Sequence, residues 1–129
     1  MPSIKTAAPQ FLVSKLSDAI AFYEERLGFT TDFVYGGFYA SVSRDGAPIH
    51  LKCAKKLEAE RDHRRSGEHL DAVLDVSGVR ELYEELARRG APITKPLEER
   101  PWSTLDFYVE DLDGYILCFS EAGRRETAA

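Results

Sequence analysis

The sequence predicts an α+β protein in which a βαβββ unit occurs twice. A strand, a helix and three short strands are expected before residue 54, and the same order is expected after residue 69. Each predicted helix ends at a glycine, Gly28 in the first unit and Gly90 in the second. Aligning Val13 with Val76 brings these glycines to within one residue of each other. Repeated units of this kind cannot bury their apolar faces alone, so we expect them to pack together.

The length supports one domain rather than two. A chain of 129 residues can form one hydrophobic core but not two independent ones. We expect a single domain at 1–129, with module one at about 8–54 and module two at about 69–121. The charged stretch at about 55–68 is expected to link the modules.

Composition and charge exclude several classes of function. The net charge is −5 and the one basic run, at residues 61–65, is interrupted, so we expect no nucleic-acid partner. The apolar runs are too short to cross a bilayer and no secretory signal is visible, so we expect no membrane partner and a cytoplasmic location. Cys53 and Cys118 lack a metal-binding spacing. We expect two buried, reduced thiols, with reactive thiols as the alternative.

The elements of the first unit follow from its apolar spacing. Gln10 to Val13 is expected to be a strand, and Ser17 is expected to cap a helix that ends at Gly28. Strands are then predicted at Thr30–Tyr35, Phe38–Ser43 and Pro48–Cys53, separated by two glycine-containing turns. Core positions are predicted for the aromatic residues Phe22, Tyr23 and Phe33.

The second unit repeats this order. Leu70 to Leu74 is expected to be a strand, and Ser77 is expected to cap the second helix. A strand at Ala91–Thr94 and a loop at Lys95–Ser103 are predicted to follow. The chain is then expected to close with a hairpin of Leu105–Glu110 and Tyr115–Glu121, joined by the sequence DLDG.

With both units in view, the chain resembles the vicinal oxygen chelate superfamily. This superfamily contains glyoxalase I, bleomycin-resistance proteins and extradiol dioxygenases. The matching segments are FLVSKLSDAIAFYEERLGF (Phe11–Phe29), SRDGAPIHL (Ser43–Leu51), VSGVRELYEELARRG (Val76–Gly90) and PWSTLDFYVEDLDGYILCF (Pro101–Phe119). The resemblance implies the glyoxalase/bleomycin-resistance fold, in which the two modules form a cupped mixed sheet. Fold alone does not give function, because the superfamily acts on many small molecules.

The resemblance also identifies four strand positions that hold a metal in some members. They fall on Ala8, His50, Asp71 and Cys118 in this chain. Alanine supplies no donor, and one imidazole, one carboxylate and one thiolate are an unusual mixture of ligands. We therefore expect no metal and no other cofactor, with His50, Asp71 and Cys118 as the ligands if a divalent ion is bound. A shifted register would place His69 at the third position instead of Asp71.

The only tryptophan, Trp102, allows two interpretations. Its indole either closes the end of the sheet as a structural plug or lines a cleft and offers a flat face for stacking. The resemblance favours the second interpretation, because this loop borders the ligand cavity in the family. Ser103 stands where a glycine usually follows Pro-Trp, which leaves the loop conformation open. The predicted ligand-binding residues are Trp102, His50, Asp71, Phe38 and Tyr108.

The function implied by the resemblance is that of a bleomycin-resistance-like binding protein. It would be a homodimer that sequesters an aromatic or cationic small molecule in a dimer cleft, without metal or catalysis, and so confers antibiotic resistance. An acidic protein suits a cationic ligand. The alternative is a metal-dependent glyoxalase or dioxygenase-type enzyme, a lyase, isomerase or thiol transferase, whose ion polarises substrate oxygens. A third hypothesis is a partner-binding module with a closed cavity.

Overall fold

The computed structural model describes residues 2–54 and 70–123, and it confirms the α+β fold with two βαβββ modules. Module one consists of β1 (Gln10–Val13), α1 (Leu16–Leu27), β2 (Thr30–Tyr35), β3 (Tyr39–Arg44) and β4 (Ala47–Cys53). Module two consists of β5 (Ala72–Asp75), α3 (Val79–Arg88), β6 (Ile93–Glu99), β7 (Thr104–Glu110) and β8 (Ile116–Ala122). The predicted linker at 55–68 and the alternative ligand His69 lie outside the described residues.

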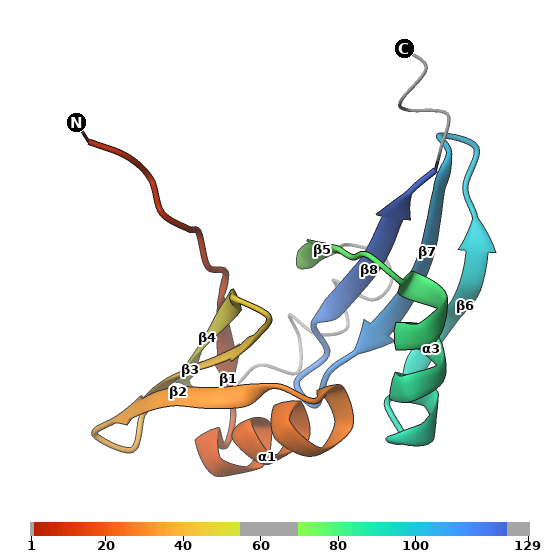
Figure 1. The fold of residues 1–129 in the computed structure, drawn as a ribbon. Helices are drawn as coiled ribbons and strands as arrows, with labels where there is room; N and C mark the ends of the chain where they lie inside the picture. The colour runs from red at the N-terminus through yellow and green to blue at the C-terminus, as the bar shows by residue number, and fades with distance from the viewer. Residues whose placement is uncertain (1, 55–69, 124–129) are drawn as a thin grey trace.

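Each module forms one mixed four-stranded sheet. Sheet A has the strand order β1-β4-β3-β2, and sheet B has the corresponding order β5-β8-β7-β6. The first strand of each module runs parallel to the last, and the other pairs are antiparallel. The sheets diverge from a shared junction, with α1 packed on sheet A and α3 on sheet B (Figure 1). Among the described residues no helix is long and apolar enough to cross a membrane.

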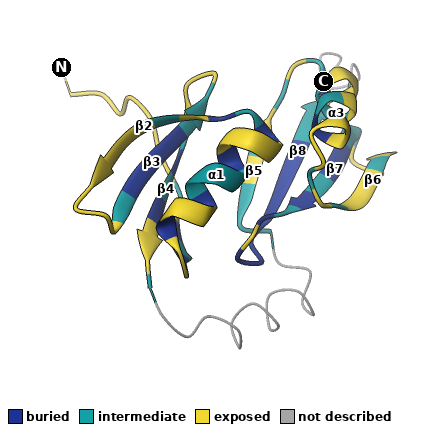
Figure 2. Cartoon of the chain, turned by 90° about the horizontal axis from the view of Figure 1, so that it is seen from below, coloured by how far each residue is buried: buried dark blue, intermediate teal, exposed yellow. Residues whose placement is uncertain are grey.

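One face of each sheet packs on its helix and forms the core. In module one the buried strand residues are Phe11, Val13, Ala40, Val42, Ile49 and Leu51, and in module two they include Phe107, Val109, Leu117 and Phe119. These residues alternate along their strands with side chains of the opposite face, as the two-residue period of a strand requires. We call the face opposite the helix the open face of each sheet. Figure 2 shows buried residues concentrated in β3, β7 and β8.

The turn between β7 and β8 joins the modules by inserting into module one. Tyr23 of α1 donates a hydrogen bond through its hydroxyl to Oδ2 of Asp111, at 2.8 Å. The backbone N–H and the hydroxyl of Ser14 donate to Oδ1 of Asp113, at 3.0 and 2.7 Å. The Tyr115 ring stacks on Phe11, with 4.2 Å between ring centroids. The DLDG motif therefore acts as the packed junction between modules as well as a hairpin turn.

Two predicted helix caps are wrong. α1 begins at Leu16, one residue before the predicted cap Ser17, and its N-cap position is Lys15, which makes no side-chain cap. α3 begins after Gly78, one residue beyond the predicted cap Ser77. The orphan N–H groups of α3 at residues 78 and 79 donate instead to Oε1 of Glu121, at 3.2 and 3.0 Å. A carboxylate distant in sequence thus replaces the local cap.

Three further predictions need correction. The predicted loop at Lys95–Ser103 is strand as far as Glu99, and its bulges accommodate a proline on the edge strand β6. Phe33, predicted to be core, is 46% exposed because it lies on the open face of sheet A. Cys53 is exposed rather than buried, whereas Cys118 is buried as predicted.

Candidate ligand-binding site

The open face of sheet A carries a cluster of aromatic rings that are partly exposed to solvent. Phe33 stacks on Tyr39 at 6.3 Å between centroids, and Tyr39 meets the His50 ring edge-on at 5.5 Å. Tyr35 lies beside Phe38 in the β2–β3 region, at 5.9 Å. Tyr35 is 69% exposed and Phe38 is 46% exposed. Exposing several aromatic rings to water is energetically unfavourable, and an exposed aromatic patch of this kind is typical of a binding surface.

The polar groups between these rings already have partners. The Tyr39 hydroxyl lies 2.9 Å from Nδ1 of His50 and accepts a hydrogen bond from Nε2 of Gln10 at 3.0 Å. Asp32 accepts hydrogen bonds from two serine hydroxyls of β3, at 2.9 and 2.8 Å. These bonds fix the orientation of the side chains. What the face offers to a ligand is therefore mainly ring surface.

The open face of sheet B is bordered by the turn that carries Trp102. The backbone N–H of Ser103 donates to the carbonyl of Arg100 at 3.0 Å, which closes a four-residue turn. Trp102 is 65% exposed, so its indole does not act as a plug within this chain. The guanidinium carbon of Arg100 lies 5.3 Å from the centre of the Tyr108 ring. Arg100 thus covers part of the open face beside the exposed indole.

The donors at the family's four metal positions do not fit a metal site in this chain. Ala8 has no donor atom, and Oδ2 of Asp71 accepts the backbone N–H of Ile116 at 2.8 Å. Burial, reinforced by nearby Asp106, raises the pKa of Cys118 to about 11, so its sulfur is a protonated thiol at neutral pH. No group of three His, Cys, Asp or Glu that could hold a metal occurs within residues 2–54 and 70–123.

The predicted ligand-binding residues fall into two groups on different modules. His50 and Phe38 belong to sheet A and its β2–β3 turn, whereas Tyr108 and Trp102 belong to sheet B and its β6–β7 turn. Asp71 immediately precedes β5, where its carboxylate binds the β8 backbone. The two sheets diverge from the junction (Figure 1). Within a single chain the predicted ligand-binding residues therefore lie in two separate groups.

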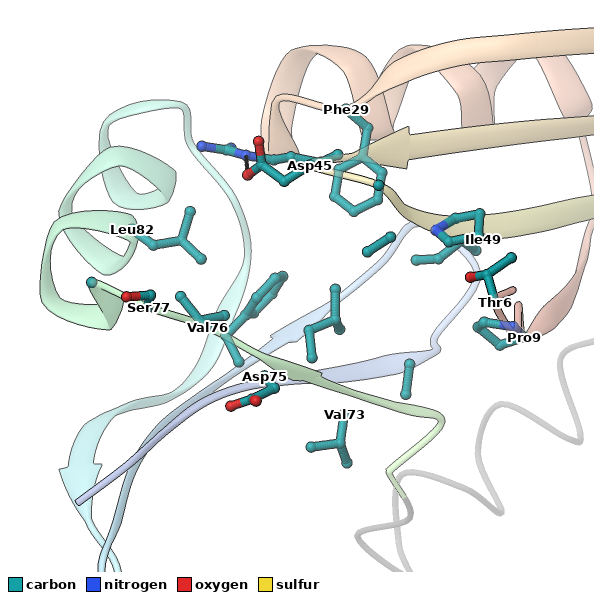
Figure 3. Close-up of a pocket in the computed structure, with 18 of the residues that line it drawn as sticks. Thr6, Pro9, Phe29, Asp45, Ile49, Val73, Asp75, Val76, Ser77 and Leu82 are labelled. Atoms are coloured by element: carbon teal, nitrogen blue, oxygen red, sulfur yellow. Dashed lines mark ion pairs between the residues drawn. The ribbon is translucent and has the colours of Figure 1, made fainter. Parts of the chain in front are cut away.

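The structure also contains a groove that the sequence did not predict. It has a volume of about 770 Å³ and lies between the β3–β4 turn of module one and the β5–α3 segment of module two. Its apolar lining includes Phe29, Ile49, Leu74, Val76, Leu82 and Phe119. In Figure 3, side chains of module two face side chains of module one across this groove. None of the five predicted ligand-binding residues lines it.

Comparison with known proteins identifies the family. The profile of the Glyoxalase/Bleomycin resistance protein/Dioxygenase superfamily matches residues 5–119. The chain therefore belongs to this superfamily, as its motifs indicated. A search among curated proteins finds no match.

Solved structures support the same fold. The bleomycin-binding protein from bleomycin-producing Streptomyces verticillus, solved with copper(II)-bleomycin, is 22% identical with a TM-score of 0.72 and covers 95% of this chain and 98% of its own. The bleomycin resistance determinant encoded on transposon Tn5 is 19% identical with a TM-score of 0.74, covering 92% and 98%. A glyoxalase/bleomycin resistance protein/dioxygenase from Alicyclobacillus acidocaldarius is 14% identical with a TM-score of 0.76, covering 97% and 96%. At these identities the likeness establishes the fold alone.

Proposed function

We propose that this protein is a binding protein that sequesters a flat, aromatic and preferably cationic small molecule without catalysis. The observation that carries the proposal is the exposed aromatic surface on both open faces, Phe33, Tyr35 and Phe38 on sheet A and Trp102 beside sheet B. Aromatic rings of this kind bind flat ligands by stacking and attract cations through the ring faces. The net charge of −5 adds a long-range attraction for cations.

The complete cleft in this proposal belongs to a homodimer. Sheet A of one copy faces sheet B of the other, so that the two groups of predicted ligand-binding residues meet around the ligand. Val73, which is 65% exposed on the open face of sheet B, would also be covered. A stable dimer of this kind buries more than about 1,000 Å². Because two copies provide two such pairs of faces, the dimer would hold two equivalent clefts.

Binding without metal chemistry is favoured over the enzyme alternative by the state of the donors. A metal-dependent lyase, isomerase or dioxygenase needs several free, deprotonated ligands around one ion. In this chain Ala8 supplies no donor, Asp71 is bonded to the backbone, and the buried Cys118 thiol hydrogen-bonds with Asp106. Among the similar structures, one is described as a bleomycin-binding protein and another as a bleomycin resistance determinant. Bleomycin-type glycopeptides are therefore the first ligands to test, with antibiotic resistance as the proposed role.

The test is a titration of a bleomycin-type glycopeptide and of planar cations such as proflavine, followed by Trp102 emission and by calorimetry. The chain has one tryptophan, so the emission change reports on one site. Stacking contributes about 1–3 kcal/mol per contact, so Trp102→Ala should weaken binding by about 5- to 150-fold. Tyr35→Ala should weaken it similarly. Val34→Ala is the matched control, because Val34 is 53% exposed on the same strand but points to the other face.

Two results would contradict the proposal. If calorimetry shows that the wild type, Trp102→Ala and Tyr35→Ala bind a ligand with equal affinity, the aromatic rings do not form the binding cleft. If sedimentation equilibrium at micromolar concentration shows only a 14.5 kDa species, with and without ligand, the protein does not form the proposed dimer.

A further inference from the structure

We propose that Arg100, Thr104 and Asp106 form a polar subsite on the open face of sheet B, which receives a neutral amide group of the ligand. The ligand group would present a carbonyl acceptor and an N–H donor side by side, as a carboxamide or cyclic amide does. This inference rests on the proposed function, because the subsite adjoins the turn at residues 100–103 that carries Trp102. It adds a specificity element that the predicted ligand-binding residues do not include.

The three side chains are brought together by strand register and by the turn. Asp106 lies two residues before Tyr108 on β7, so both side chains point to the open face. Thr104, at the start of the same strand, accepts the backbone N–H of Arg100 through its carbonyl at 2.7 Å. Arg100 then folds back over the sheet, so that its Nε lies 3.8 Å from Oδ2 of Asp106. The side chain of Asp106 is only 6% exposed as a result.

Buried polar atoms of this cluster have no hydrogen-bond partner. Within the part of the chain that the structure describes, these atoms are Nε and Nη2 of Arg100, Oγ1 of Thr104 and Oδ1 of Asp106. The 3.8 Å separation of the ion pair exceeds hydrogen-bond distance, so the pair itself supplies no hydrogen bond to these atoms. The side-chain hydrogen bonds of the two residues are those of Arg100 Nη1 with Glu98 and of Asp106 with the Cys118 thiol. A buried polar atom without a partner costs about 1–3 kcal/mol, and native proteins contain few of them. Four in one cluster indicate a surface prepared for a polar ligand.

The charges of the cluster determine which ligand chemistry fits. Arg100 and Asp106 carry opposite charges at close range, so the charges of the cluster cancel, and Glu98 adds one negative charge at its solvent edge, 3.2 Å from Arg100. The neighbouring Cys118 lies beside Asp106, and its thiol is a hydrogen-bond partner of that carboxylate. A ligand carboxylate would meet the carboxylate of Asp106, and a ligand ammonium would meet the guanidinium of Arg100. A neutral amide instead donates to Asp106 and accepts from Arg100 and Thr104.

Access to the subsite is through Arg100. Nη1 of its guanidinium forms an ion pair with Oε1 of Glu98 at 3.2 Å, and the Glu98 side chain is 63% exposed. The Glu98 side chain is exposed, but the Arg100 side chain is only 15% exposed. For an amide to enter, Arg100 must move away from Asp106 and Tyr108, and the contacts made by the ligand must offset the loss of those contacts. The amide then enters between Arg100 and Asp106 while the rest of a flat ligand rests on Tyr108 and reaches the indole of Trp102. Arg100 closes over the ligand from the turn.

The test compares benzamide, acetophenone and benzoate, which share a flat ring and differ in the polar group. Chemical-shift titration of the protein should show benzamide binding about 10-fold more tightly than acetophenone, which lacks the N–H donor, and than benzoate, which is anionic. Asp106→Asn should reduce the preference for benzamide by about 10-fold, because a charged acceptor becomes a neutral one. Thr104→Val, which removes only a hydroxyl, should weaken benzamide binding by about 5-fold.

Thermal unfolding separates a ligand subsite from a structural ion pair. A binding role predicts that Asp106→Asn leaves Tm unchanged or raises it, because a buried charge that makes no hydrogen bond to Arg100 is replaced by a neutral amide of the same shape. Arg80→Gln on α3 is the matched control for loss of charge and should alter neither Tm nor any affinity. Equal binding of the three probes, or a lowered Tm of Asp106→Asn with the benzamide preference kept, would overturn the subsite. If proflavine still binds under those conditions, the proposed function stands; if no flat ligand binds, both fail.

Discussion

The two modules meet through corresponding turns, and the two junctions differ sharply. The β7–β8 turn of module two fills the space beside α1 with Asp111, Asp113 and Tyr115. The β3–β4 turn of module one is shorter, and Arg44 at the end of β3 contacts α3 beside it, with Nη2 and Nη1 donating to Glu85 at 2.7 and 3.0 Å. The groove of about 770 Å³ opens at this second junction. The same topology thus gives a packed contact on one side and a hollow on the other.

The difference teaches that turn length, rather than strand order, decides where this fold is open. The segment from 111 to 115 can place an aspartate, a second aspartate and a tyrosine against module one, whereas the turn at 45–46 has only Asp45 and Gly46. A long turn can supply side-chain carboxylates that accept hydrogen bonds from the buried backbone N–H groups near it. The short turn leaves apolar side chains facing one another across solvent.

The carboxyl groups at the two junctions also differ, because the pKa of Asp111 is raised whereas the pKa of Glu85 is lowered. Burial raises the pKa of Asp111 to about 7, although hydrogen bonds from Tyr115, Tyr23 and Asp113 act against this rise. Glu85 is half-buried, and its hydrogen bond to Arg44, supported by Arg89, lowers its pKa to about 2. The packed junction therefore contains a carboxyl that resists ionisation, and the open junction contains a carboxylate that resists protonation.

The largest expected effect comes from Asp111→Ala at the packed junction. Oδ1 of Asp111 accepts the backbone N–H groups of Asp113 and Tyr115, both at 2.9 Å, and Oδ2 accepts the Tyr23 hydroxyl. The substitution leaves three buried donors without an acceptor, and each such donor costs about 1–3 kcal/mol. We expect the free energy of unfolding to fall by about 5 kcal/mol, measured by urea denaturation at pH 5. A loss below about 1 kcal/mol would show that the turn does not hold the modules together.

The second expected effect is a pH dependence that the two carboxyls drive in opposite directions. Because the folded pKa of Asp111, about 7, exceeds its ordinary 3.8, its contribution is complete below pH 3.8 and is lost as pH rises through 7. The loss is at most ~4 kcal/mol. Glu85 has a folded pKa of about 2 against 4.5, so its contribution is present above pH 4.5 and is lost as pH falls towards 2. Urea denaturation between pH 2 and 8 measures both.

Asp111→Asn is the control for this pH dependence. Its carboxamide oxygen can still accept two N–H groups, but the side chain no longer titrates. The decline of stability between pH 4 and 7 should therefore flatten while the acid-side decline remains. An unchanged slope would assign the titration to another group.

A smaller effect is expected from Glu85→Gln at the open junction. The ion pair with Arg44 is partly exposed, and pairs of this kind contribute about 1 kcal/mol or less. We expect a loss of that size in water and a smaller loss in 1 M salt, because salt screens exposed charges. Should the loss approach that of Asp111→Ala, the two junctions would not differ in strength, and the comparison would be wrong.

The smallest effect concerns the turns that follow β2 and β6. The first turn uses Gly36 and Gly37, with φ of 60° and 71°, whereas Ser103 of the second has φ of 71° without being glycine. A left-handed conformation costs a non-glycine residue about 1 kcal/mol. Ser103→Gly should raise the free energy of unfolding by up to about 1 kcal/mol in urea denaturation. A destabilised variant would show that the serine side chain contributes more than its backbone strain costs.

The order of elements along the chain and the C-terminal ends of the helices could be predicted because their signals are local. Apolar alternation identified β1, β2 and β4 closely, and glycine at 28 terminated α1 in the left-handed conformation as expected. The strand β6 was missed in part because Pro96 is a local breaker, and only the edge position of the strand makes it acceptable. The cap of α3 was missed because Glu121 comes from the end of β8.

The ligand site could be predicted only as a set of residue types. The sequence predicts Trp102 as a stacking surface and Phe38 as a ligand-binding residue, and the structure exposes both rings. Their places in different modules follow from the predicted module bounds, but the relative orientation of the two sheets does not, because a sequence does not say how two curved sheets are oriented. Arg100 and Asp106 were not considered, although their positions beside Trp102 and two residues before Tyr108 were available signals.

The sequence by itself determined the repeated βαβββ order, the core faces and the family, because these depend on side-chain period, glycine stops and short motifs. The tertiary structure decided which junction is packed, which is open, and which polar atoms are left without partners. These properties depend on contacts between residues about 40 to 100 positions apart, such as Tyr23 with Asp111 and Arg44 with Glu85. Burial then sets the pKa of Asp111 and the exposure of Phe33, and burial exists only once the two modules and both faces of each sheet are in place.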